Sequence, residues 1–136
     1  MSNVHRMTVR VRYPECDPGG RAHHAVFLHW LEMGRTEFMR ARGHTYADME
    51  RTGWFIAVVR ANVRYRQPVV YDEEVTVETW IETVRGARLV FGNRIRKEGT
   101  GAVAAEATIT TALVDATGRP RRFTDEEIAR MTAPAP

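Results

Sequence analysis

The sequence predicts an α+β fold in which a five-stranded antiparallel sheet wraps around one long central helix. Two observations carry this prediction. An alternating strand is followed by a long stretch with helical spacing and then by four more alternating strands. Short turns such as RGAR and KEGTG join most of those later strands, and short turns are typical of antiparallel neighbours. A sheet with one apolar face needs a covering layer, which the helix supplies.

The N-terminal part contains the first strand and the helix. Apolar and polar residues alternate over residues 6–13, which predicts a half-buried strand, and PECDPGG ends it. From about residue 25 to residue 42, apolar side chains recur at spacings of three and four. Gly43 is a suitable helix stop.

Four strands are expected after the helix, over residues 54–66, 74–83, 88–96 and 103–113. TDEEIARM predicts a short final helix capped by Thr124. In the first of these strands, strict alternation places six residues on one face: Phe55, Ala57, Val59, Ala61, Val63 and Tyr65.

Length and composition favour one globular domain over residues 1–136. Hydrophobic residues make up 43% and charged residues 27% of the 136 residues, which suits a folded core. No apolar run approaches the ~20 residues of a membrane span, and the N-terminus lacks a signal-peptide core. The single cysteine, Cys16, excludes an internal disulfide framework and a multi-cysteine zinc site. We therefore expect a cytoplasmic protein.

The charge is basic and comes from arginine. The net charge is +3, and Lys97 is the only lysine. Arginine binds phosphate and carboxylate at two points, which allows an anionic partner, although most of the individual arginines are expected to form a solvated basic surface. Nucleic acid is disfavoured, because the aromatic residues fall on apolar strand faces or in the helix and no nucleic-acid motif is present.

The stretch YPECDPGGRAHHAVFLHWLEMGRTEF resembles the 4-hydroxybenzoyl-CoA thioesterase and YbgC-like branch of the hotdog-fold acyl-CoA thioesterases. That branch carries an aromatic residue, a reactive aspartate in a glycine turn, and a His or Tyr seven residues later that opens the central helix. These positions correspond to Tyr13, Asp17, Gly20 and His24. LEMGRTEF is similar to the E-x-x-R-T-E segment of the family, through Glu32, Arg35, Thr36 and Glu37.

The resemblance extends over roughly residues 6–123. VRYRQPVVYDE is similar to the aromatic and proline segment before the family's third strand, and RGARLVF to its R-G-x-x-L-V-F hairpin. Two positions depart from the pattern. Arg21 stands where an apolar residue is usual, which would alter the entrance of the site. Phe27 stands where tyrosine is commoner, which indicates that a hydroxyl there is dispensable.

Thioester hydrolysis needs an activated water or nucleophile and a group that stabilises charge on the carbonyl oxygen. Asp17 could attack directly or act as general base for water, and the sequence leaves both routes open. The backbone N–H at His24 begins the helix and could polarise the carbonyl. Gly19 and Gly20 let the backbone approach the substrate. The competing role for Asp17 is a turn residue that binds its own backbone.

Other residues near this segment have competing roles. Tyr13 ends the apolar side of the first strand, so core packing is expected, with contact to the acyl group as the alternative. Glu32 could hold a water or the Asp17 turn, or pair with Arg35 on the helix surface. Cys16 beside Asp17 offers a rival cysteine nucleophile, which nothing in the sequence marks as activated.

The histidines do not predict a metal site. His23, His24 and His29 lack the i, i+4 spacing of two ligands on one helix face, so His23 and His29 are expected to be structural. The His24 side chain either orients substrate or lies on the surface. The resemblance implies no metal or cofactor.

An acyl-CoA substrate brings phosphates, for which Arg88, Arg121 and Arg122 are the chosen ligands. The resemblance also implies a homo-oligomer, a dimer or a dimer of dimers, with sites between subunits. Two alternatives stay open. One is a non-catalytic acyl-CoA-binding module that retains the fold; the other is a dehydratase of the same fold, which should carry a different Asp and His arrangement.

Overall fold

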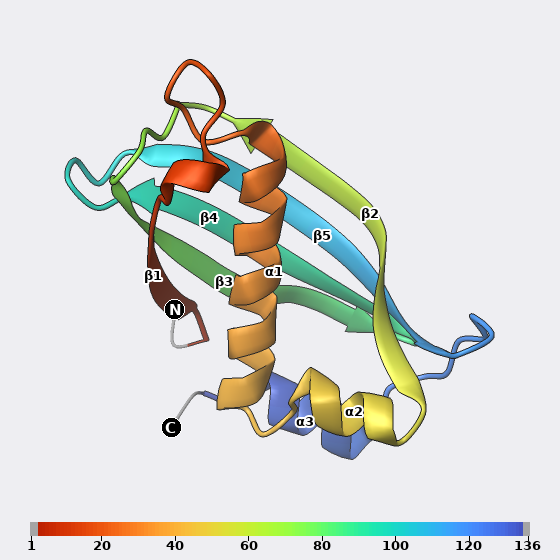
Figure 1. Ribbon diagram of the computed structural model, residues 1–136. Coiled ribbons are helices and arrows are strands. Elements are labelled where there is room, and N and C mark those ends of the chain that lie inside the picture. Colours follow the sequence, from red (N-terminus) through yellow and green to blue (C-terminus); the bar gives the residue numbers. More distant parts are fainter. Residues whose placement is uncertain (1–2, 135–136) are drawn as a thin grey trace.

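A five-stranded antiparallel sheet curves around the helix α1 (His24–Ala41) (Figure 1). The computed structural model describes residues 3–134. The strand order is β1-β3-β4-β5-β2, so β1 and β2 form the two edges. The strands and the shorter helices are β1 (His5–Arg10), η1 (Tyr13–Glu15), α2 (Tyr46–Arg51), β2 (Trp54–Tyr65), β3 (Glu74–Arg85), β4 (Arg88–Lys97), β5 (Val103–Asp115) and α3 (Asp125–Thr132).

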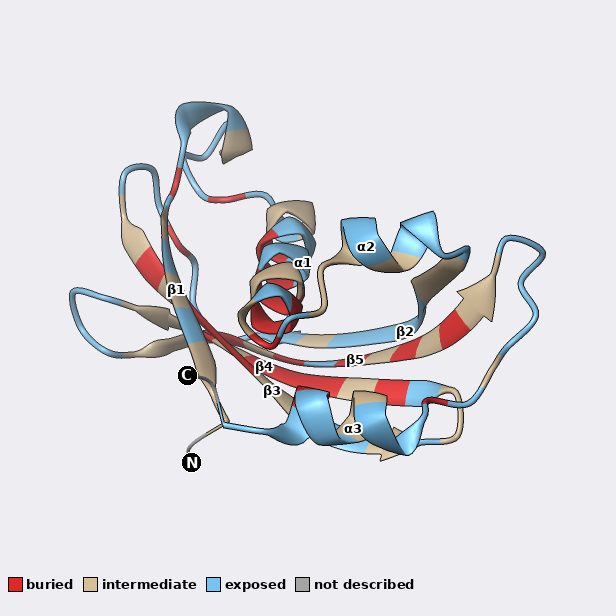
Figure 2. Cartoon of the chain, turned by 90° about the horizontal axis from the view of Figure 1, so that it is seen from below, coloured by how far each residue is buried: buried red, intermediate tan, exposed pale blue. Residues whose placement is uncertain are grey.

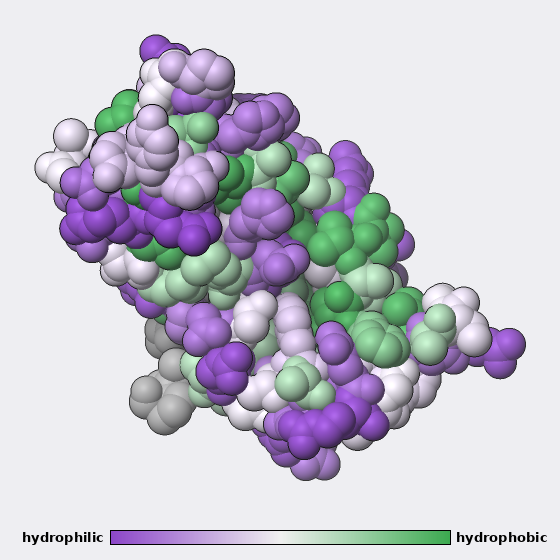
Figure 3. All heavy atoms as spheres, in the orientation of Figure 1, coloured by the Kyte–Doolittle hydropathy of each residue, from purple (hydrophilic) through white to green (hydrophobic). Residues whose placement is uncertain are grey.

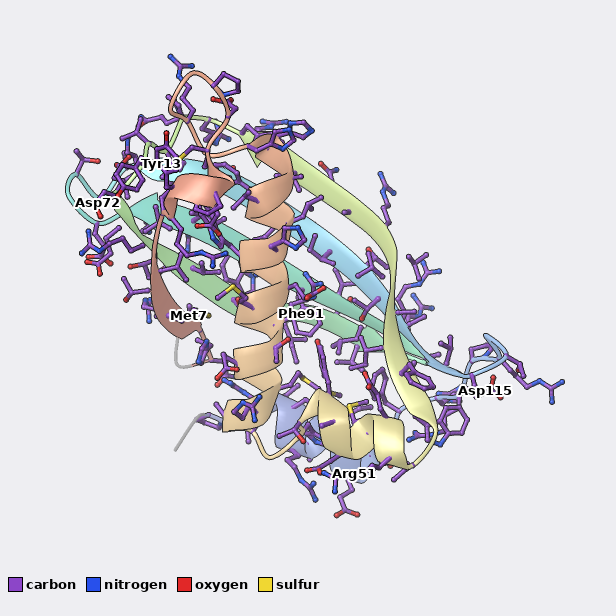
Figure 4. All side chains as sticks on the ribbon, viewed as in Figure 1. Met7, Tyr13, Arg51, Asp72, Phe91 and Asp115 are labelled. Atoms are coloured by element: carbon purple, nitrogen blue, oxygen red, sulfur yellow. The ribbon has the colours of Figure 1, made fainter. Side chains whose placement is uncertain are left out.

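The core lies between α1 and the concave face of the sheet. Buried residues follow the side of α1 that faces the central strands (Figure 2). Phe38 of α1 and Phe91 of β4 meet edge to face at 5.9 Å, and Phe91 lies beside α1 in Figure 4. Gly34 allows the helix its close approach, because a Cβ there would lie 2.5 Å from Oγ1 of Thr79 in β3.

The predicted order of elements is confirmed, and α1 has nearly the expected limits. The first strand is shorter than expected. It ends at Arg10, because the chain then turns through η1, where the Glu15 carboxylate accepts the Arg12 N–H at 2.7 Å. Tyr13 therefore leaves the alternating pattern. Its side chain is 76% exposed, so the expectation of core packing is wrong.

The prediction of which β2 residues share one face is also wrong for the N-terminal half of the strand. The register shifts between Val58, opposite Thr111, and Arg60, opposite Thr110. A β-bulge inserts one residue and reverses which face the following residues occupy. Val58 therefore shares the helix-facing side with Ala61 and Tyr65, whereas strict alternation had placed Phe55 and Ala57 there.

One of the shorter helices was not predicted from the sequence. Helix α2 was not expected, although Thr45 caps it by accepting the Asp48 N–H. Helix α3 and its cap Thr124 are confirmed, and Glu127 completes a capping box. Within residues 3–134, no helix is long and apolar enough to cross a membrane.

Candidate active site

The loop between β1 and α1 is closed by Asp17. The Asp17 N–H donates to the Arg21 carbonyl at 2.8 Å, and one carboxylate oxygen, Oδ1, accepts the N–H groups of Gly19 at 2.9 Å and Arg21 at 3.2 Å. Gly20 adopts a φ of 79°, which favours glycine. Among the described residues, the other oxygen, Oδ2, has no hydrogen-bond partner. Asp17 therefore holds the turn with one oxygen and keeps the second available.

The first turn of α1 presents an unpaired donor next to this loop. His23 is the N-cap, and its Nδ1 accepts the Ala25 N–H at 3.1 Å. The Val26 N–H donates to the His23 carbonyl at 2.9 Å. The His24 N–H has no acceptor within the part of the chain that the structure describes. An N–H at the start of an 18-residue helix carries partial positive charge, which suits a developing oxyanion.

Asp17 and His24 line one cavity of about 370 Å³ between the start of α1 and the end of β2. Phe27 and Tyr65 form its apolar side, with their rings edge to face at 5.1 Å. The Tyr65 hydroxyl donates to the His24 carbonyl at 2.9 Å, which fixes the first turn of the helix. Burial raises the pKa of Tyr65, so its phenol stays protonated at neutral pH and remains a donor.

Tyr65 was missed as a site residue. It was expected only as one of the apolar residues of an alternating strand, and Gln67 and Pro68, which also line the cavity, follow that strand in a turn. No local sequence pattern identifies these residues as part of the site, because β2 comes close to the Asp17 loop only in the folded sheet. The aromatic and proline segment in the sequence indicates a turn here but not what the turn faces.

Tyr13 and Glu32 do not line this cavity. Tyr13, the first residue of η1, packs edge to face against Tyr71 at 5.5 Å (Figure 4). Glu32 has an exposed side chain about two turns along α1, where it lines a second cavity with Arg35. Cys16 donates weakly to the Arg12 carbonyl at 3.7 Å and is also not part of the cavity lining.

Arg88, Arg121 and Arg122 were predicted to hold the CoA phosphates. They lie at the end of the sheet opposite the Asp17 cavity. The Arg121 N–H donates to the Leu113 carbonyl, and Leu113 is eight residues, about 27 Å, farther along β5 than Ala105, the partner of Tyr65. In Figure 4, Asp115 at the end of β5 marks this distant end. Arg88 and Arg122 share it, on the β3–β4 hairpin and after β5.

Arg121 already has partners there. Its guanidinium binds the Glu127 carboxylate through two hydrogen bonds of 2.9 and 3.0 Å and lies 4.8 Å from the Trp54 ring. Arg88 and Arg122 are exposed. Within one protomer, these residues do not meet Asp17. Among residues 3–134, no group of three or more His, Cys, Asp or Glu side chains is placed to hold a metal ion.

Comparison of the chain with known proteins shows its family. Residues 11–135 match the Thioesterase-like superfamily. The chain is 37% identical over 113 residues to the putative acyl-CoA thioesterase YneP of Bacillus subtilis, covering 83% of this chain and 81% of that protein. It is 30% identical over 116 residues to the acyl-CoA thioesterase YbgC of Haemophilus influenzae, with coverage of 85% and 84%.

A solved structure agrees. The DHNA-CoA thioesterase of Staphylococcus aureus superposes with a TM-score of 0.84 at 30% identity, covering 88% of this chain and 80% of that one. The chain therefore belongs to the Thioesterase-like superfamily and has the hotdog fold. It is a thioester hydrolase, and the predicted resemblance to YbgC-like thioesterases is confirmed.

Proposed function

We propose that this protein is an acyl-CoA thioesterase that hydrolyses a small, medium-chain or aromatic acyl-CoA to the free acid and CoA. One observation carries the proposal: the free oxygen of Asp17 and the unpaired N–H of His24 line the same cavity. The first can act on the carbonyl carbon or on water, and the second can receive the carbonyl oxygen. The names of the relatives support the substrate class.

In the proposed reaction, the thioester oxygen accepts the His24 N–H, and negative charge develops at the positive end of α1. By the nucleophilic route, Asp17 forms an anhydride with the acyl group while the carbon–sulfur bond breaks and CoA leaves as thiolate; water then hydrolyses the anhydride. By the base route, Asp17 takes a proton from water as the water attacks the carbonyl carbon; the carbon–sulfur bond then breaks, and CoA leaves as a thiolate that takes up the proton. Gly19 and Gly20, predicted to approach the substrate, do not line the cavity; they shape the loop that carries Asp17.

A second copy of the chain completes the site in this proposal. Edge strand β2 has an unpaired side, with Trp54 at one end and Tyr65 at the other. Twofold antiparallel pairing of β2 with itself would set the Trp54 end of one copy against the Tyr65 end of the other. Arg121, which lies on Trp54, would then approach the second copy's cavity.

This arrangement gives the distant arginines a role. Arg88, Arg121 and Arg122 would hold the CoA phosphates of the substrate bound at the partner's Asp17, because arginine forks match phosphate oxygens. Replacing all three with alanine should raise the Michaelis constant for acyl-CoA and leave an acyl thioester without the nucleotide unaffected.

The proposal is tested by replacing Asp17 with asparagine. Asn keeps an oxygen that can accept the Gly19 N–H, so the loop and the melting temperature should be retained. Loss of the carboxylate should lower turnover of acyl-CoA by at least ~100-fold. Acyl-CoA hydrolysis, followed with a thiol reagent over short, long and aromatic acyl groups, measures the effect.

Two control variants sharpen the test. Cys16→Ala should be nearly silent, and the reverse pattern of activities would transfer the chemistry to Cys16. His24→Ala keeps the backbone N–H and should lose far less turnover than Asp17→Asn if that N–H polarises the carbonyl. If the wild type binds acyl-CoA tightly and hydrolyses none, the alternative function, an acyl-CoA-binding module, replaces the proposal.

A further inference from the structure

Two peptide groups meet at the Cα of His24, and both are held by hydrogen bonds. The peptide that carries the His24 N–H has its carbonyl, from His23, bound by the Val26 N–H at 2.9 Å. In the next peptide, the Ala25 N–H donates to Nδ1 of His23 at 3.1 Å. The carbonyl of that peptide, from His24, accepts the Tyr65 hydroxyl at 2.9 Å. Because peptide groups are planar, these bonds together fix the direction of the His24 N–H.

The bond from Tyr65 differs from the other two because it comes from a distant element. The other two lie within residues 23–26 and would move with the start of the helix, where helices fray. Tyr65 lies at the end of β2, where it pairs with Ala105 of β5. The next residue, Arg66, is also held, because its N–H donates to the Ala104 carbonyl at 2.8 Å. The Tyr65 hydroxyl therefore ties the start of α1 to the sheet.

The Tyr65 hydroxyl is committed to the helix and not to the substrate oxygen. A phenol has one proton to donate, and the His24 carbonyl accepts it. The Tyr65 ring packs edge to face on Phe27 at 5.1 Å, which restricts the side chain. The contact is complete within one protomer. Tyr65 thus acts on the site through the backbone of His24.

We propose that Tyr65 is a positioning residue for thioester hydrolysis: its hydroxyl holds the His24 N–H where the carbonyl oxygen of the substrate develops negative charge. This inference rests on the proposed thioesterase function. A donor stabilises an oxyanion only when it lies about 2.7–3.1 Å from it, so a small displacement of the helix start weakens the interaction. Because the attraction grows as the charge develops, the loss should fall on kcat more than on substrate binding.

Tyr65→Phe tests this role, since it removes the hydroxyl and keeps the ring that packs on Phe27. With the acyl-CoA that the wild type hydrolyses fastest, kcat should fall about 10- to 100-fold, the scale of a misplaced catalytic group. KM should change by less than about threefold. Tyr71→Phe is the matched control and should keep the wild-type kcat, because Tyr71 is 52% exposed and packs on Tyr13 outside the cavity.

Melting curves separate positioning from folding. The loop before α1 keeps an attachment of its own, in which the Ala22 N–H donates to the Val69 carbonyl at 2.7 Å, so Tyr65→Phe should remain folded. A folded variant with the wild-type kcat would overturn the proposal. A loss that lies entirely in KM would assign the hydroxyl to substrate binding, and a variant that does not fold would assign it to stability; either result would also overturn the proposal.

Infrared spectra of a bound thioester distinguish this inference from the proposed reaction. Benzoyl-CoA, isotope-labelled at the carbonyl carbon, is bound to Asp17→Asn and to the double variant Asp17→Asn/Tyr65→Phe. Both proteins should bind it with similar Kd. In Asp17→Asn, a hydrogen bond from the His24 N–H should polarise the carbonyl and lower its stretching frequency below that of free benzoyl-CoA. In the double variant, the frequency should return toward the free value.

The spectra give separate answers for the two proposals. An equally lowered frequency in both proteins would overturn the role of Tyr65 and leave the proposed reaction intact. A frequency that is not lowered in Asp17→Asn would contradict the role of the His24 N–H in the proposed reaction, and the inference about Tyr65 with it. A lowered frequency in Asp17→Asn that is lost in the double variant would support the positioning role even if turnover were slow.

Discussion

At the scale of single residues, Gly34 shows how closely the backbone of α1 approaches side chains of β3. Gly34 lies in the middle of α1, where glycine weakens an isolated helix. Its reason is tertiary: a Cβ would meet Thr79 Oγ1 at 2.5 Å and Val77 Cγ1 at 2.9 Å. Both neighbours belong to β3, so the glycine sets how closely helix and sheet approach.

Gly34→Ala should therefore destabilise the protein by about 1–3 kcal/mol, the range of an overpacked core, despite the better helix propensity of alanine. Gly99→Ala is the matched control, since its Cβ would meet nothing within 4 Å and its φ is not positive. Urea unfolding of the two variants measures the difference. An unchanged midpoint for Gly34→Ala would show that α1 can shift away from β3 at no cost.

At the scale of elements, an ion pair between Arg121 and Glu127 links α3 to the segment that precedes it. The hydrogen bond from Arg121 is the main reason that the pKa of Glu127 falls from 4.5 to about 2; burial opposes this shift, and the bond from the Thr124 N–H adds to it. A carboxyl with a depressed folded-state pKa stabilises the fold fully above its unfolded pKa. That stability is lost as pH falls from about 4.5 toward 2.

Glu127→Gln should cost about 1–2 kcal/mol at pH 7, because the glutamine oxygen can still accept the Thr124 N–H but loses the charge. The difference from wild type should shrink between pH 4.5 and pH 2. Glu126→Gln on the same helix is the control, since that side chain is 83% exposed and should contribute little. Urea titration at each pH measures the difference in the free energy of unfolding between Glu127→Gln and the wild type. A difference that does not change with pH would contradict the assignment of this stability to the Glu127 carboxylate.

At the scale of the whole molecule, the edge strand β2 has a hydrogen-bonded neighbour on only one of its two sides within the described residues. Strand β2 is a 12-residue edge on which Val58 and Val59 are 53% and 57% exposed. Apolar surface gathers along β2 beside α1 in Figure 3. Long apolar edges pair with other chains unless they are protected.

Val59→Lys should convert the protein to the 15.5 kDa monomer and lower its activity, because a charge at the middle of β2 would oppose edge pairing. Met33→Lys, at an exposed apolar position on α1, is the control and should not change the mass. Light scattering at micromolar concentration gives the result. A fully active wild type with the monomer mass would defeat the proposed assembly.

Local patterns determined much of this protein. Alternation gave the five strands, three- and four-residue spacing gave α1, and Thr124 marked the start of α3. Asp17 and His24 lie within eight consecutive residues, so the motif could be recognised without the fold. Each of these features depends on backbone geometry and neighbours close in sequence.

Tertiary structure decided the rest. The bulge after Val58, the exposure of Tyr13 and the pairing of Arg121 with Glu127 reversed or altered what alternation and charge had indicated. Tyr65 entered the site from 41 residues away. Such features depend on which distant surfaces meet, because packing of the whole sheet against α1 sets the register and burial that no local pattern contains.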